Sequence, residues 1–233
     1  MTNLGSHIRY SDMANEPQHN LTDDELRALY AVISKERMGT YLFASGHDEQ
    51  RAARLYIWNA LVGEAFHVPI QAVEVGLRNR INHALAAKYG GEWWNSQPFL
   101  DLIDGDRLDD LNLVRSRIKR RKQTLGTGQI VAGLSFGFWV GMLAKRYNPE
   151  LWSAHLHSSF PHFPEDRGRK SLAMEAGQIV TLRNRIWHHE PIFKRNLMDD
   201  YSRVMQLLEW LCPVKHSWIK PHCKVPQIMR QKP

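Results

Sequence analysis

Apolar and polar residues follow one another along this chain with the period of amphipathic helices. Thr22 precedes a run in which apolar side chains recur every three or four residues from Leu26 to Ile33, and Glu25 stands three residues after Thr22. This spacing is that of a capping box, in which the two side chains bond to each other's backbone N–H at a helix start. Residues 50–66 repeat the helical spacing and predict a second helix.

Further segments carry the same pattern. Pro69 suits the first turn of a third helix, which runs to Tyr89 and is ended by Gly90 and Gly91. The other predicted helices cover residues 106–122, a short segment capped by Ser135, residues 171–188 and residues 196–211.

The alternation typical of strands is scarce, so the pattern predicts an all-α fold. We expect one helical domain at residues 21–212, between a disordered polar leader at 1–20 and a basic tail at 213–233. The longest apolar run, Ile130 to Leu143, is interrupted by polar and glycine residues and is too short to cross roughly 30 Å of hydrocarbon as a helix.

Charge and cysteine content narrow the function classes. Lysine and arginine outnumber aspartate and glutamate by 31 to 24, giving a formal net charge of +7, which favours a polyanionic partner. The two cysteines supply no disulfide framework, and the first residues lack the apolar core of a signal peptide, so we expect a soluble protein of the reducing cytoplasm. Motifs for nucleotide phosphates, for a nucleophilic serine or for zinc hydrolysis are absent from the sequence, and we expect no cofactor.

The most informative motif lies near the end of the helix predicted at 171–188. Arg183, Asn184 and His188 combine a permanent cation, a carboxamide and an imidazole. Residues four apart share a helical face, so Asn184 and His188 lie one above the other. An imidazole moves protons near neutral pH and a guanidinium fits phosphate oxygens, which are the minimum parts for breaking a phosphodiester bond without a metal.

The motif has an earlier near copy. Residues 77–83 read as residues 182–188 do, with Asn82 in place of Trp187. We interpret this copy as structural, with Arg78 paired to Glu74 one turn earlier.

Together these residues resemble the HEPN superfamily and, more narrowly, the Abi-like (abortive infection) proteins of bacteria. The resemblance rests on the Arg-Asn-x3-His string at 183–188 and on supporting blocks in the same order, from residue 25 to 210. These blocks are Tyr56-x-Trp58-Asn59, Glu74-x3-Arg78-Asn79, Tyr89-Gly90-x2-Trp93-Trp94 and Leu134-Ser135-Phe136-Gly137-Phe138-Trp139.

The resemblance implies an all-helical fold and a metal-independent endoribonuclease, of the kind that serves as a toxin or antiphage effector. It also implies a homodimer in which the two motif helices face each other. Carried over onto this chain, the catalytic residues are Arg183, Asn184 and His188. The motif's spacing also admits His189, but we prefer His188, which shares a face with Asn184. Pro191 disfavours helix at Glu190, so we expect His189 to lie at a fraying helix end.

Basic residues form a second candidate site. Cations crowd the end of the helix predicted at 106–122, and an RNA-binding surface is expected there; its residues are Arg117, Lys119, Arg120, Arg121 and Lys122. The alternative is a solvated helix end favoured by the helix dipole. The basic tail is either a flexible nucleic-acid arm or simply a soluble terminus.

Other interpretations stay open. The helices could form an RNA- or protein-binding module of a bacterial defence system that performs no chemistry, or the basic tail could associate with membranes. Cys212, His216, His222 and Cys223 could be read as zinc ligands, but adjacent ligands at 222 and 223 depart from the usual spaced pairs. We expect RNA as the partner, with an antitoxin or a phage-derived trigger as a further possibility, and no membrane.

Overall fold

The computed structural model describes residues 20–153 and 155–233. Every regular element within these residues is helical, which confirms the predicted all-α fold. Apart from Asn20, the leader expected at residues 1–20 lies outside the described residues. None of the described helices is both long and apolar enough to span a bilayer.

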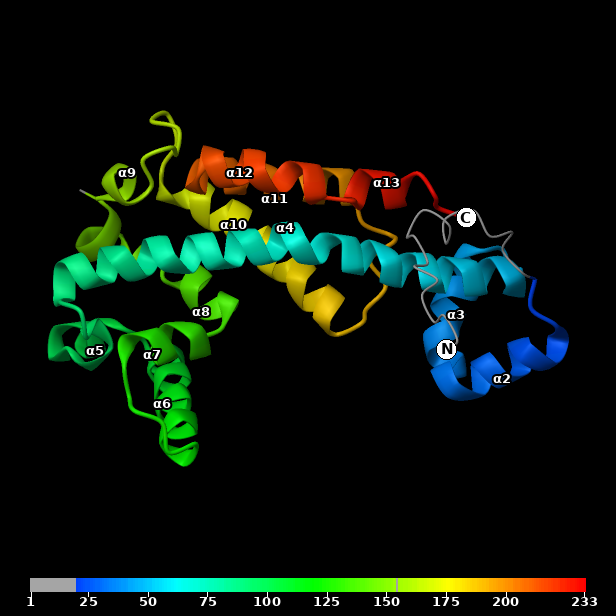
Figure 1. Ribbon diagram of the computed structural model, residues 1–233, viewed down its shortest axis with the longest axis horizontal. Coiled ribbons are helices and arrows are strands. Elements are labelled where there is room, and N and C mark those ends of the chain that lie inside the picture. The colour runs from blue at the N-terminus through cyan, green and yellow to red at the C-terminus, as the bar shows by residue number, and fades with distance from the viewer. Residues whose placement is uncertain (1–19, 154) are drawn as a thin grey trace, which may run out of the picture. The chain divides into compact units, whose positions relative to one another are not determined.

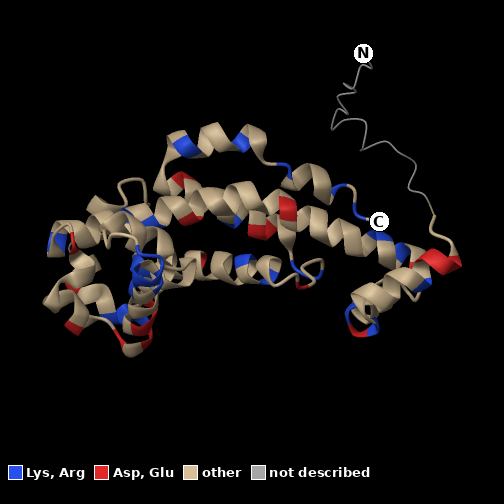
Figure 2. Cartoon of the chain, turned by 60° about the horizontal axis from the view of Figure 1, so that its bottom comes forward, with Lys and Arg blue, Asp and Glu red and all other residues tan. Residues whose placement is uncertain are grey.

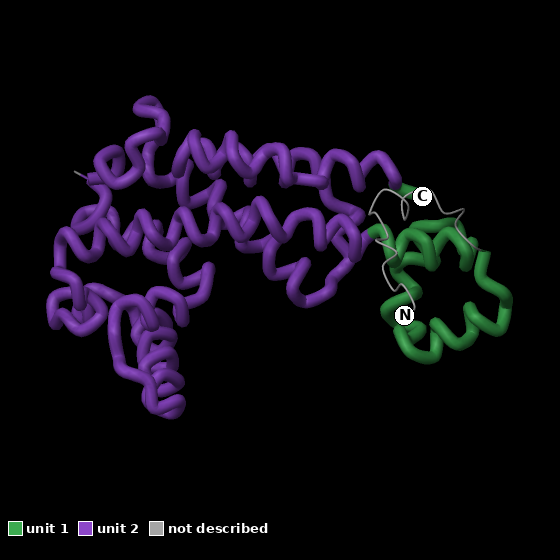
Figure 3. The backbone as a smooth tube through the Cα atoms, in the orientation of Figure 1, with its two compact units in different colours: residues 1–58, 232–233 green, residues 59–231 purple. Residues whose placement is uncertain are grey.

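Two compact units make up the chain, and Figure 3 colours them separately. Of the described residues, 20–58 and 232–233 belong to unit 1, and 59–153 and 155–231 belong to unit 2. The helices before the boundary are α2 (Asp23–Ile33) and α3 (Lys35–Ala44), and the boundary falls within α4 (Glu49–Tyr89). Those after it are η1 (Trp93–Asn95), α5 (Gln97–Leu102), α6 (Gly105–Arg120), α7 (Thr127–Gly133), α8 (Phe136–Gly141), η2 (Lys145–Tyr147), η3 (Asn148–Trp152), α9 (Leu156–Ser159), α10 (Arg169–Trp187), α11 (Leu197–Leu211), α12 (Pro213–Ile219), η4 (Lys220–His222) and α13 (Val225–Met229).

Side chains at the helix starts set several of these boundaries. The Thr22 amide donates to Glu25 Oε2 at 2.7 Å and the Glu25 amide donates to Thr22 Oγ1 at 3.3 Å, which confirms the capping box at α2. Ser135 caps α8 by accepting from the Phe138 amide at 3.1 Å. The helices predicted at 106–122, 171–188 and 196–211 are confirmed as α6, α10 and α11, with ends shifted by at most two residues.

One predicted boundary is wrong. Residues 50–66 and 69–89 form a single helix, α4, with Pro69 inside it. An internal proline removes one backbone hydrogen bond and costs about 3 kcal/mol. Burial offsets this cost, because the neighbours Phe66, Ile70 and Val73 are completely buried.

α4 carries the core of unit 2. Fully buried residues follow one another every three or four positions along it, at Val62, Phe66, Ile70, Val73, Leu77, Ile81 and Leu85. Figure 1 shows α11 and α12 on one side of this helix and α6 and α7 on the other. The stripe therefore provides the surface on which the helices that hold the candidate site are packed.

Helices α12, η4 and α13 occupy most of residues 213–229. The interpretation of the tail as a flexible arm is therefore wrong for this segment. α12 begins with Pro213 in its first turn, where a missing N–H costs nothing. The Lys215 amide donates to Cys212 Sγ at 3.4 Å, and Ile219 and Val225 are buried.

Candidate functional site

The motif helix α10 ends in a defined turn at the candidate histidines. Trp187 is its last residue, and the His188 amide still donates to the Asn184 carbonyl at 2.9 Å. His189 has a φ of 55°, in the left-handed region. The His189 amide donates to the Ile186 carbonyl at 3.0 Å and the Glu190 amide to the Arg185 carbonyl at 2.8 Å, which is the Schellman pattern.

The three predicted catalytic residues lie in the last turn of α10 and at its C-cap. Asn184 and His188 are exposed one helical turn apart, as their spacing predicts. The Arg183 side chain is 27% exposed, and its Nη1 lies 3.5 Å from Asn184 Oδ1. His189 lies just beyond the helix with a different backbone conformation, so the preference for His188 as the residue aligned with Asn184 is consistent with the backbone.

Arg183 has two partners that the sequence did not indicate. Its Nε lies 3.7 Å from Glu74 Oε2 on α4, and its guanidinium carbon lies 4.8 Å from the centre of the Trp187 ring. At 3.7 Å the carboxylate attracts the cation without forming a hydrogen bond, and Arg183 Nε is buried with no hydrogen-bond partner. The arginine is therefore held in place while part of its donor capacity remains unused.

The earlier copy of the motif behaves differently. Glu74 pairs with Arg183, and among the described residues it forms no ion pair with Arg78, so the predicted Arg78–Glu74 pair is wrong. Asn82 Oδ1 accepts a hydrogen bond from Trp93 Nε1 at 2.8 Å, which ties α4 to η1. His83 is exposed on the same helix.

Sequence reasoning missed a further imidazole beside the motif. The His67 ring of α4 stacks on the Trp187 ring with centroids 5.5 Å apart and planes at 20°. His67, like His188, is exposed. His67 and Trp187 are far apart in the sequence, and no local pattern links them, so only the packing of α4 against α10 reveals this contact.

A buried asparagine holds the loop that follows the motif. Asn59, 8% exposed, accepts hydrogen bonds from the Ile192 amide at 2.7 Å and the Phe193 amide at 3.2 Å. Its Nδ2 also donates to the Glu190 carbonyl at 3.5 Å. Asn59 belongs to one of the blocks on which the family resemblance rests, and its contacts give it a structural role as a clamp on residues 190–193.

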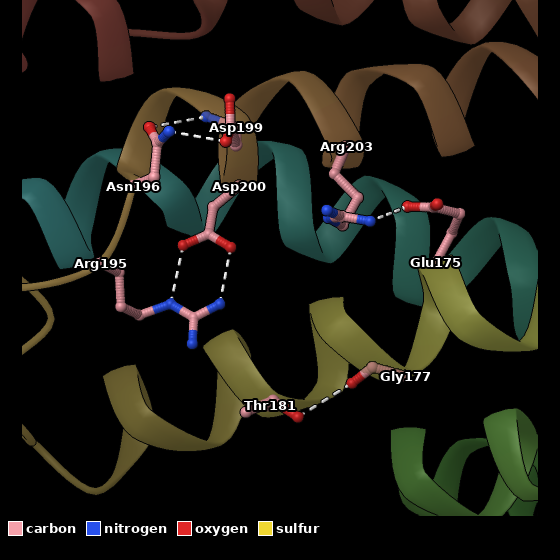
Figure 4. A network of polar contacts seen from close by, with 8 residues as sticks. All are labelled: Glu175, Gly177, Thr181, Arg195, Asn196, Asp199, Asp200 and Arg203. Atoms are coloured by element: carbon pink, nitrogen blue, oxygen red, sulfur yellow. Dashed lines mark hydrogen bonds and ion pairs between the residues drawn. The ribbon is translucent and has the colours of Figure 1, made fainter.

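Figure 4 shows polar contacts at the start of α11 and one ion pair between α11 and α10. Arg195 makes two hydrogen bonds of 2.7 Å to the buried Asp200 carboxylate, and these hydrogen bonds raise the pKa of Arg195. Arg203 of α11 pairs with Glu175 of α10. Asn196 caps α11 by accepting from the Asp199 amide at 3.3 Å. Of these contacts, the Arg203–Glu175 pair joins α11 to α10, and the others order the start of α11.

The second candidate site lies at the C-terminal end of α6. Its five predicted residues, Arg117, Lys119, Arg120, Arg121 and Lys122, are all exposed, and none forms an ion pair with a described residue. The neighbouring Arg115 is separate, because it donates to the Trp94 carbonyl and its guanidinium lies 5.4 Å from the Trp94 ring centre. The Lys and Arg colour of Figure 2 gathers at this end of α6, and Figure 1 places it on a different part of unit 2 from the end of α10.

The zinc interpretation finds no geometry to support it. Within the described part of the chain, no three His, Cys, Asp or Glu side chains converge as metal ligands would. Cys212 caps α12, and Cys223 Sγ donates to the Ile219 carbonyl at 3.5 Å. These sulfurs are therefore engaged in local backbone contacts.

The arrangement at the end of α10 offers an exposed proton-transfer group, an exposed carboxamide and a guanidinium whose side chain is partly exposed. These groups suit an anionic ligand that reaches the surface from solvent. Compared with protein-family models, with curated proteins and with solved structures, the chain has no match.

Proposed function

We propose that the chain is a metal-independent endoribonuclease of the HEPN kind, resembling the Abi-like proteins, and that it acts in antiphage defence or growth arrest in the cytoplasm. The observation that carries the proposal is the exposure of Asn184 and His188 on one face at the ordered end of α10, beside Arg183. A loop substrate such as RNA can approach these side chains without displacing the core.

The reaction uses the 2′-OH of the substrate as nucleophile, a group that DNA lacks. His188 accepts the 2′-OH proton as the O2′–P bond forms, and the P–O5′ bond breaks as a second acid protonates the leaving oxygen. Arg183 donates to the phosphate oxygens on which charge develops, and Asn184 orients the phosphate or the His188 ring.

In this proposal the second acid is the His188 side chain of a partner protomer. A homodimer in which the two α10 ends face each other places one His188 from each protomer at the scissile bond. Sedimentation of the purified protein tests this part, and a strictly monomeric enzyme with full activity would contradict it. His67, on the same protomer, is then the alternative source of the second imidazole.

Cleavage of a mixed tRNA and mRNA pool in the presence of EDTA tests the proposal. We expect wild type to leave 2′,3′-cyclic phosphate or 3′-phosphate and 5′-OH ends, and His188→Ala to leave the RNA intact. His83→Ala is the matched control, because this histidine occupies the same place in the earlier copy of the motif and is equally exposed. Equal loss of activity in His188→Ala and His83→Ala, or equal cleavage by wild type and His188→Ala, would contradict the assignment of His188 as a catalytic residue.

A second candidate function is an RNA- or protein-binding module without chemistry. It is favoured by the Glu74 carboxylate and Trp187 ring that already engage Arg183, and by the exposed cations at the end of α6. Under this function, replacing Arg120 and Arg121 with glutamine weakens RNA binding and lowers its salt dependence by about 0.7 per lost phosphate contact, whereas His188→Ala has no effect. An antitoxin or phage-derived trigger remains compatible with either function.

A further inference from the structure

α12 packs against the rest of unit 2 through Lys215 and Ile219. Lys215 Nζ donates to the Ala72 carbonyl of α4 at 3.0 Å, and burial of this side chain lowers the pKa of Lys215. Ile219 is buried on the same element, and the α12 cap at Cys212 joins it to the end of α11. These contacts fix the orientation of the helix and determine which of its residues face solvent.

The residues left in solvent include two large apolar side chains. Val214 is 78% exposed and Trp218 is 68% exposed, and they lie four residues apart on one helical face. A tryptophan that exposed contributes almost nothing to the core, so the fold itself does not account for it. Its position on an ordered helix, rather than in a loop, presents the indole ring to solvent in a defined direction.

Within the tail itself, the charged side chains all have one sign. From Pro213 to Gln231 the chain has four lysine or arginine residues and no aspartate or glutamate, although the whole protein carries 24 acidic residues. Lys215 is engaged by α4, whereas Lys220 is exposed and follows Trp218 by two residues. The electrostatic partner of such a segment is an anion.

An aromatic and basic face of this kind could bind a second copy of the chain, a bilayer or a polynucleotide, and the first two fit poorly. A second copy of the same face would bring Lys220 against its own counterpart and repel itself. A bilayer needs a longer apolar face, whereas α12 has seven residues and offers Val214 and Trp218. A single-stranded polynucleotide supplies both unpaired bases that stack on an indole ring and a phosphate for Lys220.

We infer that the exposed face of α12 binds single-stranded RNA, with Trp218 stacking on a base and with Lys220 contacting a phosphate. The choice of RNA rests on the proposed function. Figure 1 shows α12 on the side of α4 opposite α6, so this surface is a second contact for a long substrate and is distinct from the basic end of α6. Stacking tolerates every base, and the surface therefore holds the strand without reading its sequence.

Fluorescence anisotropy with a labelled oligouridine strand tests the inference. All proteins carry His188→Ala, so that the strand stays intact if the proposed nuclease activity exists and the binding result does not depend on it. Trp218→Ala is expected to weaken binding roughly 5- to 150-fold and Trp218→Phe much less, since stacking is worth about 1–3 kcal/mol per base. Lys220→Gln lowers the slope of log affinity against log salt by about 0.7.

Met174→Ala is the matched control, because this apolar side chain of α10 is 56% exposed outside the proposed surface. Oligothymidine DNA should bind within a few-fold of the RNA, and duplex RNA more weakly, since only unpaired bases stack on Trp218. Unchanged affinity in Trp218→Ala, or preference for the duplex, would overturn the inference. It would also be overturned if the substitution abolished binding to phosphatidylglycerol vesicles, or self-association, and left RNA affinity unchanged.

Discussion

Glu74 Oε2 lies 3.7 Å from Arg183 Nε, and this contact joins α4 to the motif helix α10. Both side chains are about a quarter exposed, so water screens part of the attraction. The pair holds the guanidinium in place and at the same time competes with any phosphate that would bind it.

Glu74→Gln should strengthen RNA binding, because Arg183 no longer faces a negative charge. We expect several-fold higher affinity at low salt and a loss of unfolding free energy of at most about 1 kcal/mol, as for other partly exposed ion pairs. Titration of a labelled RNA measures the first and urea unfolding the second. Glu209→Gln makes the same change of net charge at an exposed position of α11, and an equal gain in that control would show that only total charge matters.

Asn59→Ala should destabilise unit 2, because the buried amides of Ile192 and Phe193 lose their acceptor. Each unsatisfied buried group costs about 1–3 kcal/mol, so for the two amides we expect a decrease of about 2–6 kcal/mol in the free energy of unfolding. Chemical denaturation measures it, with the exposed Asn79→Ala as control. A change no larger than in Asn79→Ala would mean that the loop at 190–193 does not depend on the clamp.

Lys122→Gly should stabilise the end of α6. Lys122 has a φ of 54°, and its amide donates to the Lys119 carbonyl at 2.9 Å as the left-handed residue of a Schellman turn. Glycine adopts this conformation without strain, so we expect a gain of about 0.5–1 kcal/mol in thermal or urea unfolding. Lys119→Gly removes the same charge from the last turn of the helix and should destabilise it, and the same sign of change in both would refute the explanation.

Asp104 should make stability depend on pH in the acid range. Burial raises its pKa, but hydrogen bonds from the Arg107 amide and the Tyr147 hydroxyl outweigh this and lower the pKa below 3.8. The carboxylate therefore contributes stability that is complete above its unfolded-state pKa and is lost as the pH falls through the lower folded-state value. Asp104→Asn should lower the urea midpoint near neutral pH, and its difference from wild type should shrink below about pH 3.8. A difference that stays constant through that range would contradict the assignment.

Contacts between residues close in the sequence, such as helix caps, could be predicted from the sequence. Contacts between distant segments could not. Thr22 and Ser135 cap helices because a hydroxyl three residues before an amide can reach it, whatever the rest of the fold does. Pro69 was misread because its local penalty is visible in the sequence, whereas the burial of Phe66 and Ile70 that offsets it arises only in the folded core.

In the candidate site, too, local features could be predicted from the sequence and contacts between helices could not. The exposure of Asn184 and His188 on one face follows from helical spacing, so it could be predicted. Glu74 has an arginine one turn away in Arg78, yet it pairs with Arg183 from another helix, because the packing of α4 on α10 decides which cation comes within reach. His67 has no local relation to Trp187 and could be found only in the structure.

The Asn59 clamp also bears on when the site forms during synthesis. Asn59 and Ile192 are 133 residues apart, so their hydrogen bond cannot form until residue 192 has left the ribosome. Closing so long a loop is slow compared with forming α4 or α10 alone. A nascent chain can therefore form the separate helices before the Asn59 clamp orders the loop that follows the Arg-Asn-x3-His string.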